Sequence, residues 1–410
     1  MRHARTGVTV TFAVAGALVG VFTARIPALV DTLSMTTMQL GVLLVVWGLG
    51  AVVTMQVLRP VMARVGSACV LRVAAPLYAV SVALVACAPT FGLVMLEVAM
   101  FGVAFGAVEV SAKAQGSAVE RAYGRPLLSG MHAGWPVGAG VGGLSAALCA
   151  HLGVSYATCL GGAAVLALPL TVALGRTLLD APPAAPSVQP RTRGRVRPVV
   201  YLFGLVAFAA LVLEGAVTDW TGVLLHDGLG SSQAVAALAY PVFQAGMLTG
   251  RLAADRARSR VGDRNLVIGA GLATTAGFLA ATASPQPLVV LAGVYGVGVA
   301  ISPLLPLAVS LAGATDRQHS EAAIAQLSVI GYAGLLAGPA MIGALADLVV
   351  LRVALAVVAV LLGSVIVMAG QLLPEPDTRV MESPRSGSMT DPPHLEACMP
   401  RGPGGFSWQP

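Results

Sequence analysis

"LEGAVTDW", residues 213–220, repeats the pattern of "LVGVFTAR", residues 18–25, and the alignment continues to place Asp31 near Asp227. Three further pairs align in the same order: 63–66 with 259–262, 101–107 with 295–301, and 132–143 with 332–343. All four offsets fall between 194 and 200 residues. Weak internal symmetry of this kind, kept in order at a nearly constant offset, predicts a duplicated chain whose two halves fold alike.

The composition indicates a protein that lies in a lipid bilayer. Of the 410 residues, 57% are hydrophobic and only 10% are charged, and the mean hydropathy is +0.84. A soluble domain carries about 25% charged residues. Apolar stretches long enough to cross roughly 30 Å of hydrocarbon as helices recur along the chain. The 48 glycines fit this class, because small residues let membrane helices pack closely.

Twelve apolar spans are expected, which predicts an all-α membrane protein. They cover residues 7–28, 38–58, 70–88, 91–112, 127–150, 155–175, 199–222, 233–250, 265–284, 287–311, 323–346 and 350–370. With the N-terminus inside, 21 of the 24 basic residues fall in cytoplasmic segments, Arg251 and Arg256 among them. Such a bias predicts that both termini are cytoplasmic. The net charge of +6 then reflects topology, and no nucleic-acid partner is expected.

The spans divide into two pseudo-symmetric bundles of six helices. Residues 1–175 form the first bundle and residues 199–370 the second, and the Pro-, Arg- and Ser-rich stretch 176–198 is predicted to be a cytoplasmic linker. Residues 371–410, rich in Pro, Gly and Ser, are predicted to be a disordered cytoplasmic tail. Arginine outnumbers lysine 23 to 1, which favours a GC-rich bacterium and hence its cytoplasmic (inner) membrane.

This layout resembles the major facilitator superfamily, whose two halves are parallel repeats. The resemblance covers nearly all of residues 7–370. Within the superfamily, "EGAVTDWTGVLL" and "GYAGLLAGPAMIG" are similar to the branch of MosC/YbjJ-like and fucose-permease-like transporters. The fourth-span motif of that branch, Asp-Val-x-Met-Asn-x-Gln, reads Glu-Val-Ser-Ala-Lys-Ala-Gln at 109–115. Glu replaces Asp and Lys replaces Asn, so the substrate need not match that of any relative.

A second resemblance concerns the superfamily's loop between spans two and three, Gly-x-x-x-Asp-Arg-x-Gly-Arg-Arg. Residues 59–68 keep Arg64 and Gly66 of this signature and lose its Asp. The second half keeps more, with Asp255 and Arg256 following Gly250-Arg251. The resemblance implies that these residues form a cytoplasmic gating loop that latches when the transporter faces outward.

Charges inside the spans mark the candidate substrate-binding or coupling residues. Ionisable groups at membrane depth are costly and usually face a bundle interior or a watery cavity. The resemblance implies that spans one, four, seven and ten line the central cavity. The interior charges lie on spans four and seven: Glu97, Glu109, Lys113 and Glu214. Arg25, near the outer end of span one, joins the candidates.

Each candidate also has a structural reading. Lys113 lies one helical turn after Glu109 and either takes part in coupling or simply neutralises it. Glu214 either takes part in substrate binding or coupling, or forms a structural salt bridge with Arg25. Asp219 reads more readily as a helix-end charge than as a substrate contact.

Neutral or switchable polar residues complete the candidate set. His132 could complete a Glu–Lys–His cluster or be a packing residue. Gln244 and Tyr332 could hydrogen-bond a substrate or only a neighbouring helix.

The expected function is secondary active transport of a small polar organic solute, coupled to protons, by alternating access of a monomer. Two alternatives stay open: efflux of a drug or a self-made metabolite by proton antiport, and a transporter-like membrane receptor. No phosphate loop supports ATP-driven transport, and no helix carries metal-type His/Glu spacing. No enzymatic activity, cofactor or metal is therefore expected.

Overall fold

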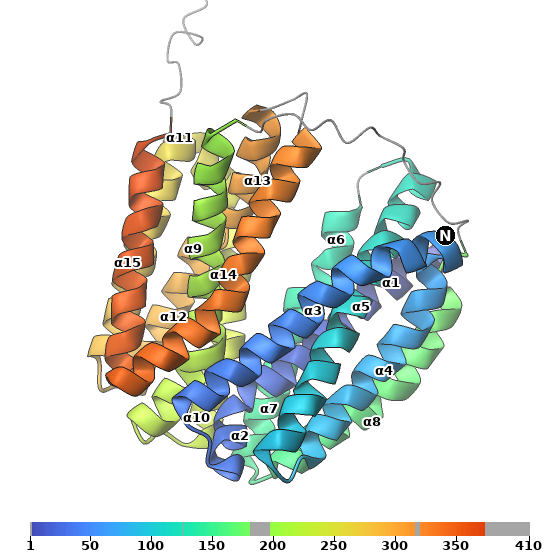
Figure 1. The fold of residues 1–410 in the computed structure, drawn as a ribbon, viewed down its shortest axis with the longest axis horizontal. Coiled ribbons are helices and arrows are strands. Elements are labelled where there is room, and N and C mark those ends of the chain that lie inside the picture. The colour runs from blue at the N-terminus through green and yellow to red at the C-terminus, as the bar shows by residue number, and fades with distance from the viewer. Residues whose placement is uncertain (1, 126, 181–196, 316–319, 374–410) are drawn as a thin grey trace, which may run out of the picture. The chain divides into compact units, whose positions relative to one another are not determined.

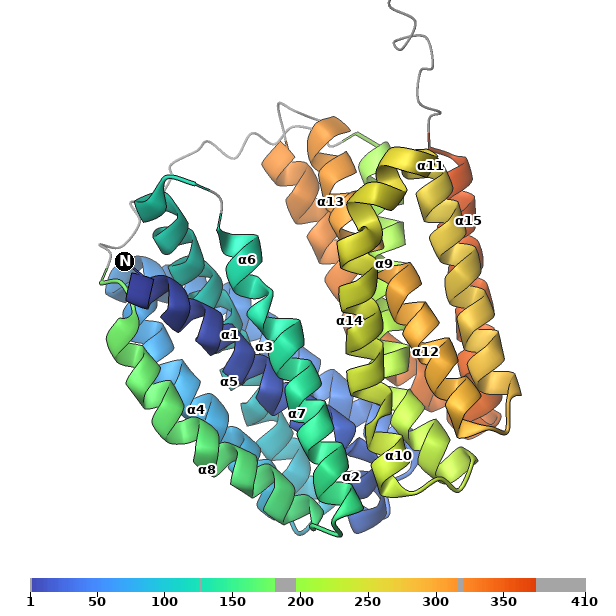
Figure 2. The same cartoon turned by 180° about the vertical axis from the view of Figure 1, so that it is seen from behind.

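The computed structural model describes residues 2–125, 127–180, 197–315 and 320–373, which form one compact unit. Within these ranges the regular structure is entirely helical (Figures 1 and 2). The predicted tail and most of the predicted linker lie outside the described residues. The division into separate domains therefore stays a prediction, which rests on the repeat.

The first half, residues 2–180, contains eight α-helices and a short 3-10 helix. They are α1 (Arg2–Ala24), α2 (Ile26–Leu33), α3 (Thr37–Val65), α4 (Ser67–Cys87), α5 (Phe91–Tyr123), α6 (Leu128–His132), α7 (Gly134–His151), α8 (Tyr156–Leu174) and η1 (Gly175–Thr177). Spans one and five are each broken in two, at Arg25 and at Ala133, and the other four are continuous helices.

The second half comprises the described residues 197–373. Its elements are α9 (Val199–Val223), the π-helix η2 (Leu224–Gly228), α10 (Gln233–Ala237), α11 (Ala239–Ala283), α12 (Pro287–Ile301), α13 (Leu304–Thr315), α14 (Ser320–Leu348) and α15 (Leu351–Gln371). Spans eight and nine lie together in α11, which is divided at Gly262 by a backbone kink with φ 77° and ψ 168°.

Eleven candidate membrane spans are present in the described part of the chain. One of them, Gln233–Ala283, has 51 residues and contains two of the twelve predicted spans. The break at Gly262 has its counterpart at Gly66, which separates α3 from α4 with φ 84° and ψ 150°. The all-helical fold of two six-span halves predicted from the sequence is thus confirmed.

The helices of spans two, four and eight run past the ends expected for the apolar spans; in span four, expected to end at residue 112, α5 continues to Tyr123. Span two was expected to end at residue 58, but α3 continues to Val65. Span eight was expected to end at 250, but α11 runs on to the kink at Gly262, so Arg251 lies within a helix and not in a loop. Arginines end the apolar pattern in these last turns. The helix nevertheless continues, because Arg and Ala are good helix formers.

The helices approach one another closely where glycines face backbone. A Cβ atom on Gly138 of α7 would overlap the carbonyl of Ala13 in α1, and one on Gly142 would overlap that of Ala17. Small residues are therefore what allows α1 and α7 to pack along their length.

The two halves meet at the end of the unit that holds α2, η2 and α10, here called the α2 end. Figures 1 and 2 show α2 and α10 side by side there. The hydroxyl of Thr37, at the start of α3, donates to Asp347 of α14 over 2.6 Å. At the opposite end, the α6 end, Figure 1 draws α6 and α13 apart from each other. The contacts between the halves described above thus lie at the α2 end.

Candidate functional site

Glu109, Lys113 and His132 form one cluster in the first half. The Nζ atom of Lys113 lies 2.6 Å from Oε1 of Glu109, one turn earlier on α5. His132, the last residue of α6, places Nε2 3.7 Å from the same oxygen. The other carboxyl oxygen, Oε2, is buried and has no hydrogen-bond partner among the described residues. The structure therefore brings together three residues that the sequence singled out, and leaves one carboxylate oxygen uncommitted.

The cluster is reachable from solvent through its basic members. The side chain of Glu109 is only 12% exposed, whereas those of Lys113 and His132 are 44% and 33% exposed. The ring of Phe12 in α1 packs 4.8 Å from that of His132, which holds the imidazole beside the carboxylate. Lys113 also interacts electrostatically with Tyr332 of α14, a partly exposed residue of the second half. Tyr332 is thus placed to face this cluster.

A second cluster surrounds Glu214 in α9. Glu214 and Asp219 are both half-buried and both interact electrostatically with the Tyr240 hydroxyl. Thr218 donates to Oδ1 of Asp219 over 3.1 Å. The amide of Gln244 donates to the Tyr240 hydroxyl over 3.2 Å, one turn along α11. Sequence reasoning selected Glu214 and Gln244 but missed Tyr240, whose only signal was its i–4 spacing from Gln244.

Tyr78 of α4 lies between the two clusters. Its ring is 1% exposed and stacks on Phe101 at 5.2 Å. The hydroxyl donates to the carbonyl oxygen of Ala15 over 3.2 Å and interacts electrostatically with Glu109 and Tyr240. Span three, which is not among the spans expected to line the cavity, therefore contributes one polar group to the interior.

Arg25 does not pair with Glu214. It is 4% exposed, and its Nη2 donates to the carbonyl oxygen of Val154 over 3.1 Å. The salt bridge between Arg25 and Glu214, weighed above as the structural alternative, is not formed within the described residues. Arg25 instead holds the break between α1 and α2 against the turn that leads into α8.

Glu214 interacts electrostatically with Arg251 of α11. The end of α9 and the start of α11 both lie at the α2 end. Glu214 lies about 14 Å along the helix from the end of α9, and Arg251 about 18 Å from the start of α11. The two residues therefore lie at similar depth. Arg251 was not among the candidates predicted from the sequence. The apolar run of span eight ends at residue 250, so Arg251 was expected to lie in a loop.

The predicted gating residues all lie near the α6 end. Arg64 is in the last turn of α3 and Gly66 follows it. Asp255 and Arg256 lie in α11, about two turns before Gly262. The ion pair observed in this stretch joins Arg258 to Asp263 across the kink, with Nε–Oδ1 and Nη2–Oδ2 distances of 2.6 and 3.1 Å. Sequence reasoning missed this bidentate pair, whose partners are five residues apart.

Gln115, the last residue of the fourth-span motif, has a structural role. Its side chain is fully buried; Nε2 donates to Ser67 Oγ and to the carbonyl of Leu179, and Oε1 accepts from the amide of Leu179. Nearby, Arg72 Nη1 lies 2.8 Å from Asp180 Oδ1. This hydrogen bond from Arg72 lowers the pKa of the exposed Asp180 carboxyl. The chain beyond α8 is thereby fastened to α4 and α5.

Comparison with known proteins places these features in a family. The profile of the Major Facilitator Superfamily matches residues 8–319 and 224–394. The transporter y4wD of Sinorhizobium fredii is 31% identical over 370 residues, which are 88% of this chain and 96% of that protein. The membrane protein MosC of Rhizobium meliloti is 27% identical over 348 residues, 84% of each chain.

Solved structures resemble the fold as a whole. The nucleoside transporter NupG aligns with a TM-score of 0.71 at 15% identity, over 90% of this chain and 100% of that one. A D-xylose–proton symporter aligns with a TM-score of 0.70 at 14% identity, over 89% of this chain and 96% of that one. At these identities the likeness concerns the fold.

Proposed function

The chain belongs to the major facilitator superfamily, a family of transporters, and from this premise we propose that it moves a small polar organic solute in exchange or in company with protons. The observation that carries the proposal is the Glu109 cluster. One carboxylate oxygen contacts Lys113 and lies near His132, and the other is buried and has no partner in the part of the chain that the structure describes. An acidic group with one uncommitted oxygen, partly shielded from water, is suited to gaining and losing a proton.

The coupling step follows from the geometry of the pair. Ionised Glu109 holds the Lys113 ammonium at 2.6 Å. Protonation of Glu109 removes the charge that Lys113 pairs with, and the ammonium is then available to a solute or to Tyr332. Because Tyr332 belongs to the second half, a change at Glu109 alters an interaction between the halves. Alternating access consists largely of rocking one half against the other around such a central site.

The polar groups at the site favour the class of solute. Lys113 offers an ammonium and His132 an imidazole from the first half, and Gln244 and Glu214 offer an amide and a carboxylate from the second. Charge on opposite walls suits a small solute that carries both acceptors and donors, such as an organic acid or amino compound. A purely apolar solute would displace water from these groups without offering hydrogen bonds in its place, at a cost of about 1–3 kcal/mol for each bond that is lost.

The proposal also includes the orientation of the protein in the membrane and its oligomeric state. Both termini and the 176–198 linker lie in the cytoplasm of a bacterium, and the monomer is the working unit. The positive bias of the segments between spans supports this orientation. The α6 end then faces the cytoplasm, and the α2 end faces outward.

A solute screen in proteoliposomes tests the proposed function. Purified protein is reconstituted, and uptake and counterflow of a library of small polar solutes are measured with and without an imposed pH gradient. We expect at least one polar solute to show counterflow and to accumulate only when the gradient is present. Counterflow that is indifferent to the gradient would contradict the proton coupling, and no counterflow by any solute would contradict the proposed substrate class.

A further inference from the structure

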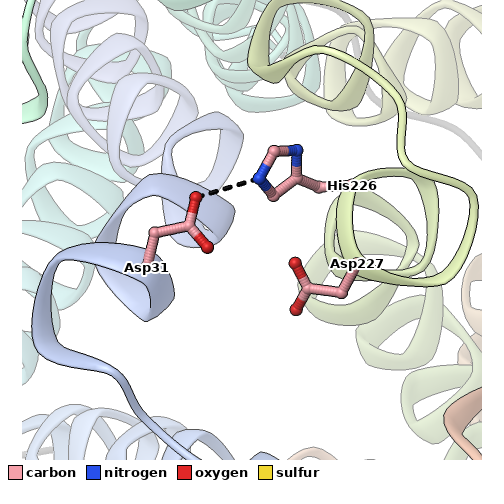
Figure 3. Close-up of side chains that lie close together, drawn as sticks. All are labelled: Asp31, His226 and Asp227. Atoms are coloured by element: carbon pink, nitrogen blue, oxygen red, sulfur yellow. Dashed lines mark hydrogen bonds and ion pairs between the residues drawn. The ribbon is translucent and has the colours of Figure 1, made fainter.

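Three potential metal ligands converge at the α2 end. Asp31 lies in α2, and His226 and Asp227 lie in η2, so the first ligand comes from the first half and the other two from the second (Figure 3). One ligand atom from each residue lies within 4.8 Å of the other two. The offset of 195 that aligns residues 18–25 with 213–220 pairs Asp31 with His226, the neighbour of Asp227. Corresponding segments of the two halves therefore supply the three ligands.

The two ring nitrogens of His226 face oxygen atoms on both sides. Nδ1 lies 2.7 Å from the carbonyl oxygen of Ser231, which can only accept, so Nδ1 carries a hydrogen. In the neutral imidazole Nε2 then offers a lone pair, and Oδ2 of Asp31 lies 2.9 Å from it. An imidazole nitrogen and a carboxylate oxygen that face each other are both ligand atoms of the kind that Zn²⁺ accepts.

Hydrogen bonds from neighbouring groups orient His226 and Asp31, as is common for side chains that bind a metal ion. A ligating histidine usually donates its other ring nitrogen to a carbonyl or carboxylate, and ligating carboxylates are hydrogen-bonded in turn. His226 has such a bond to Ser231, and the amide of Gln233 donates to Oδ2 of Asp31 over 2.6 Å. The Oε1 atom of Gln233 is buried and finds no hydrogen-bond partner among the described residues. Both the imidazole and one carboxylate are thus oriented in advance.

We propose that Asp31, His226 and Asp227 form a site for a divalent transition metal of the Zn²⁺ class. Zn²⁺ accepts one imidazole nitrogen and two carboxylate oxygens and leaves a fourth position for water. Ca²⁺ and Mg²⁺ prefer sites made only of oxygen. Two carboxylates and a neutral imidazole carry a charge that Zn²⁺ cancels. The side chains of Asp31 and His226 are 48% and 25% exposed, so the ion reaches them from water.

The site bridges the halves, and this has a functional consequence that rests on the proposed function. Alternating access that opens the α2 end would separate α2 from η2 and remove a ligand. A ligand shifts a conformational equilibrium by the difference in its affinity for the two states. Bound Zn²⁺ therefore favours the state with the α2 end closed, and slows transport.

Metal binding is tested on the purified full-length protein, carrying a tag without histidine and stripped with a chelator. ZnCl₂, CaCl₂ and MgCl₂ are titrated separately by calorimetry. We expect His226→Gln to lose one Zn²⁺ per chain and Asp227→Asn to weaken that binding at least about tenfold. His151→Gln, at an exposed histidine ending α7, is the matched control and keeps the site. Equal Zn²⁺ binding by all variants overturns the proposal.

A thermal readout checks the same site without any solute. ZnCl₂ should raise the melting temperature of the parent and of His151→Gln, and leave that of Asp227→Asn unchanged. Asp227 is exposed, so its replacement by Asn leaves the packing intact. A parent that neither binds Zn²⁺ nor gains stability from it would overturn the proposal. If Zn²⁺ binds and solute exchange continues unslowed, the site stands and the proposed opening at the α2 end is wrong.

Discussion

Gly66 and Gly262 have nearly the same backbone conformation, with φ/ψ of 84°/150° and 77°/168°. Each follows the second span of its half, and 196 positions (262 minus 66) separate them in the sequence. Positive φ with ψ near 150–180° is a region that essentially only glycine occupies. The duplication is therefore visible in the backbone itself, at the point where the chain turns between the second and third spans of each half.

Replacing Gly262 by alanine should destabilise the protein. The Cβ atom would force the residue out of this conformation or hold it there under strain, at a cost of about 1–3 kcal/mol. Thermal unfolding of the purified protein should show a lower melting temperature. Gly269→Ala is the control, because Gly269 lies in the same helix with open space around it and alanine there favours the helix. Equal losses in both variants would show that the strain argument is wrong.

Glu109→Gln should abolish proton-driven accumulation and leave solute exchange largely intact. Glutamine keeps the size of the side chain but cannot alternate between charged and neutral forms, so the gradient has nothing to act on. Accumulation against a pH gradient and counterflow without one are measured in the same proteoliposomes. Glu97→Gln, on the same helix and outside the cluster, shows whether the loss of any carboxylate on α5 has the same effect. Full accumulation by Glu109→Gln would mean that Glu109 and Lys113 are only a structural ion pair.

Glu214→Gln should weaken solute binding and leave coupling in place. A lost hydrogen bond to a charged group costs about 1.5–3 kcal/mol, roughly a tenfold or greater rise in the dissociation constant. Arg251→Gln should also weaken binding, because Arg251 interacts with Glu214. The double variant should lose less than the sum of the two, since residues in one network are not additive. Strict additivity would show that Arg251 and Glu214 act separately.

Topology can be tested by reporter fusion. Alkaline phosphatase folds into an active form only outside the cytoplasm, so a fusion after Pro190 should be inactive. A fusion after Gly153, in the exposed turn between α7 and α8, should be active. The reverse pattern would invert the proposed orientation and place the Asp31–His226–Asp227 cluster on the cytoplasmic side.

Most of the fold could be predicted from the sequence because membrane thickness sets the length of each apolar span. The continuation of α3 to Val65 and of α11 from residue 250 to the kink at Gly262 could not, because helices continue into water on polar residues that the hydropathy pattern does not distinguish from a loop. The pair of Glu109 and Lys113 was predictable because i, i+4 residues share one face of a helix. Its neighbour His132 was placed by depth alone, and the structure supplies the contact.

Contacts between distant helices lay beyond sequence reasoning. Asp31 and His226 are 195 positions apart (226 minus 31), and their hydrogen bond depends on how the two halves pack. The repeat placed Asp31 near Asp227. It carried no information that the segments around these two residues would meet in the folded protein. Likewise, the interaction of Glu214 with Arg251 follows from the depth of Arg251, which the end of the apolar run concealed.

The close approach of α7 to α1 also constrains which mutations the gene can accept. Every single-nucleotide change that replaces a glycine codon by another amino acid adds at least a Cβ atom. At Gly138 and Gly142 this atom would collide with the main chain of α1, so no neighbouring codon offers a tolerable residue. Gly140 lies between them on the same helix and faces open space. Natural variation in this segment should therefore be found at position 140 and be absent at positions 138 and 142.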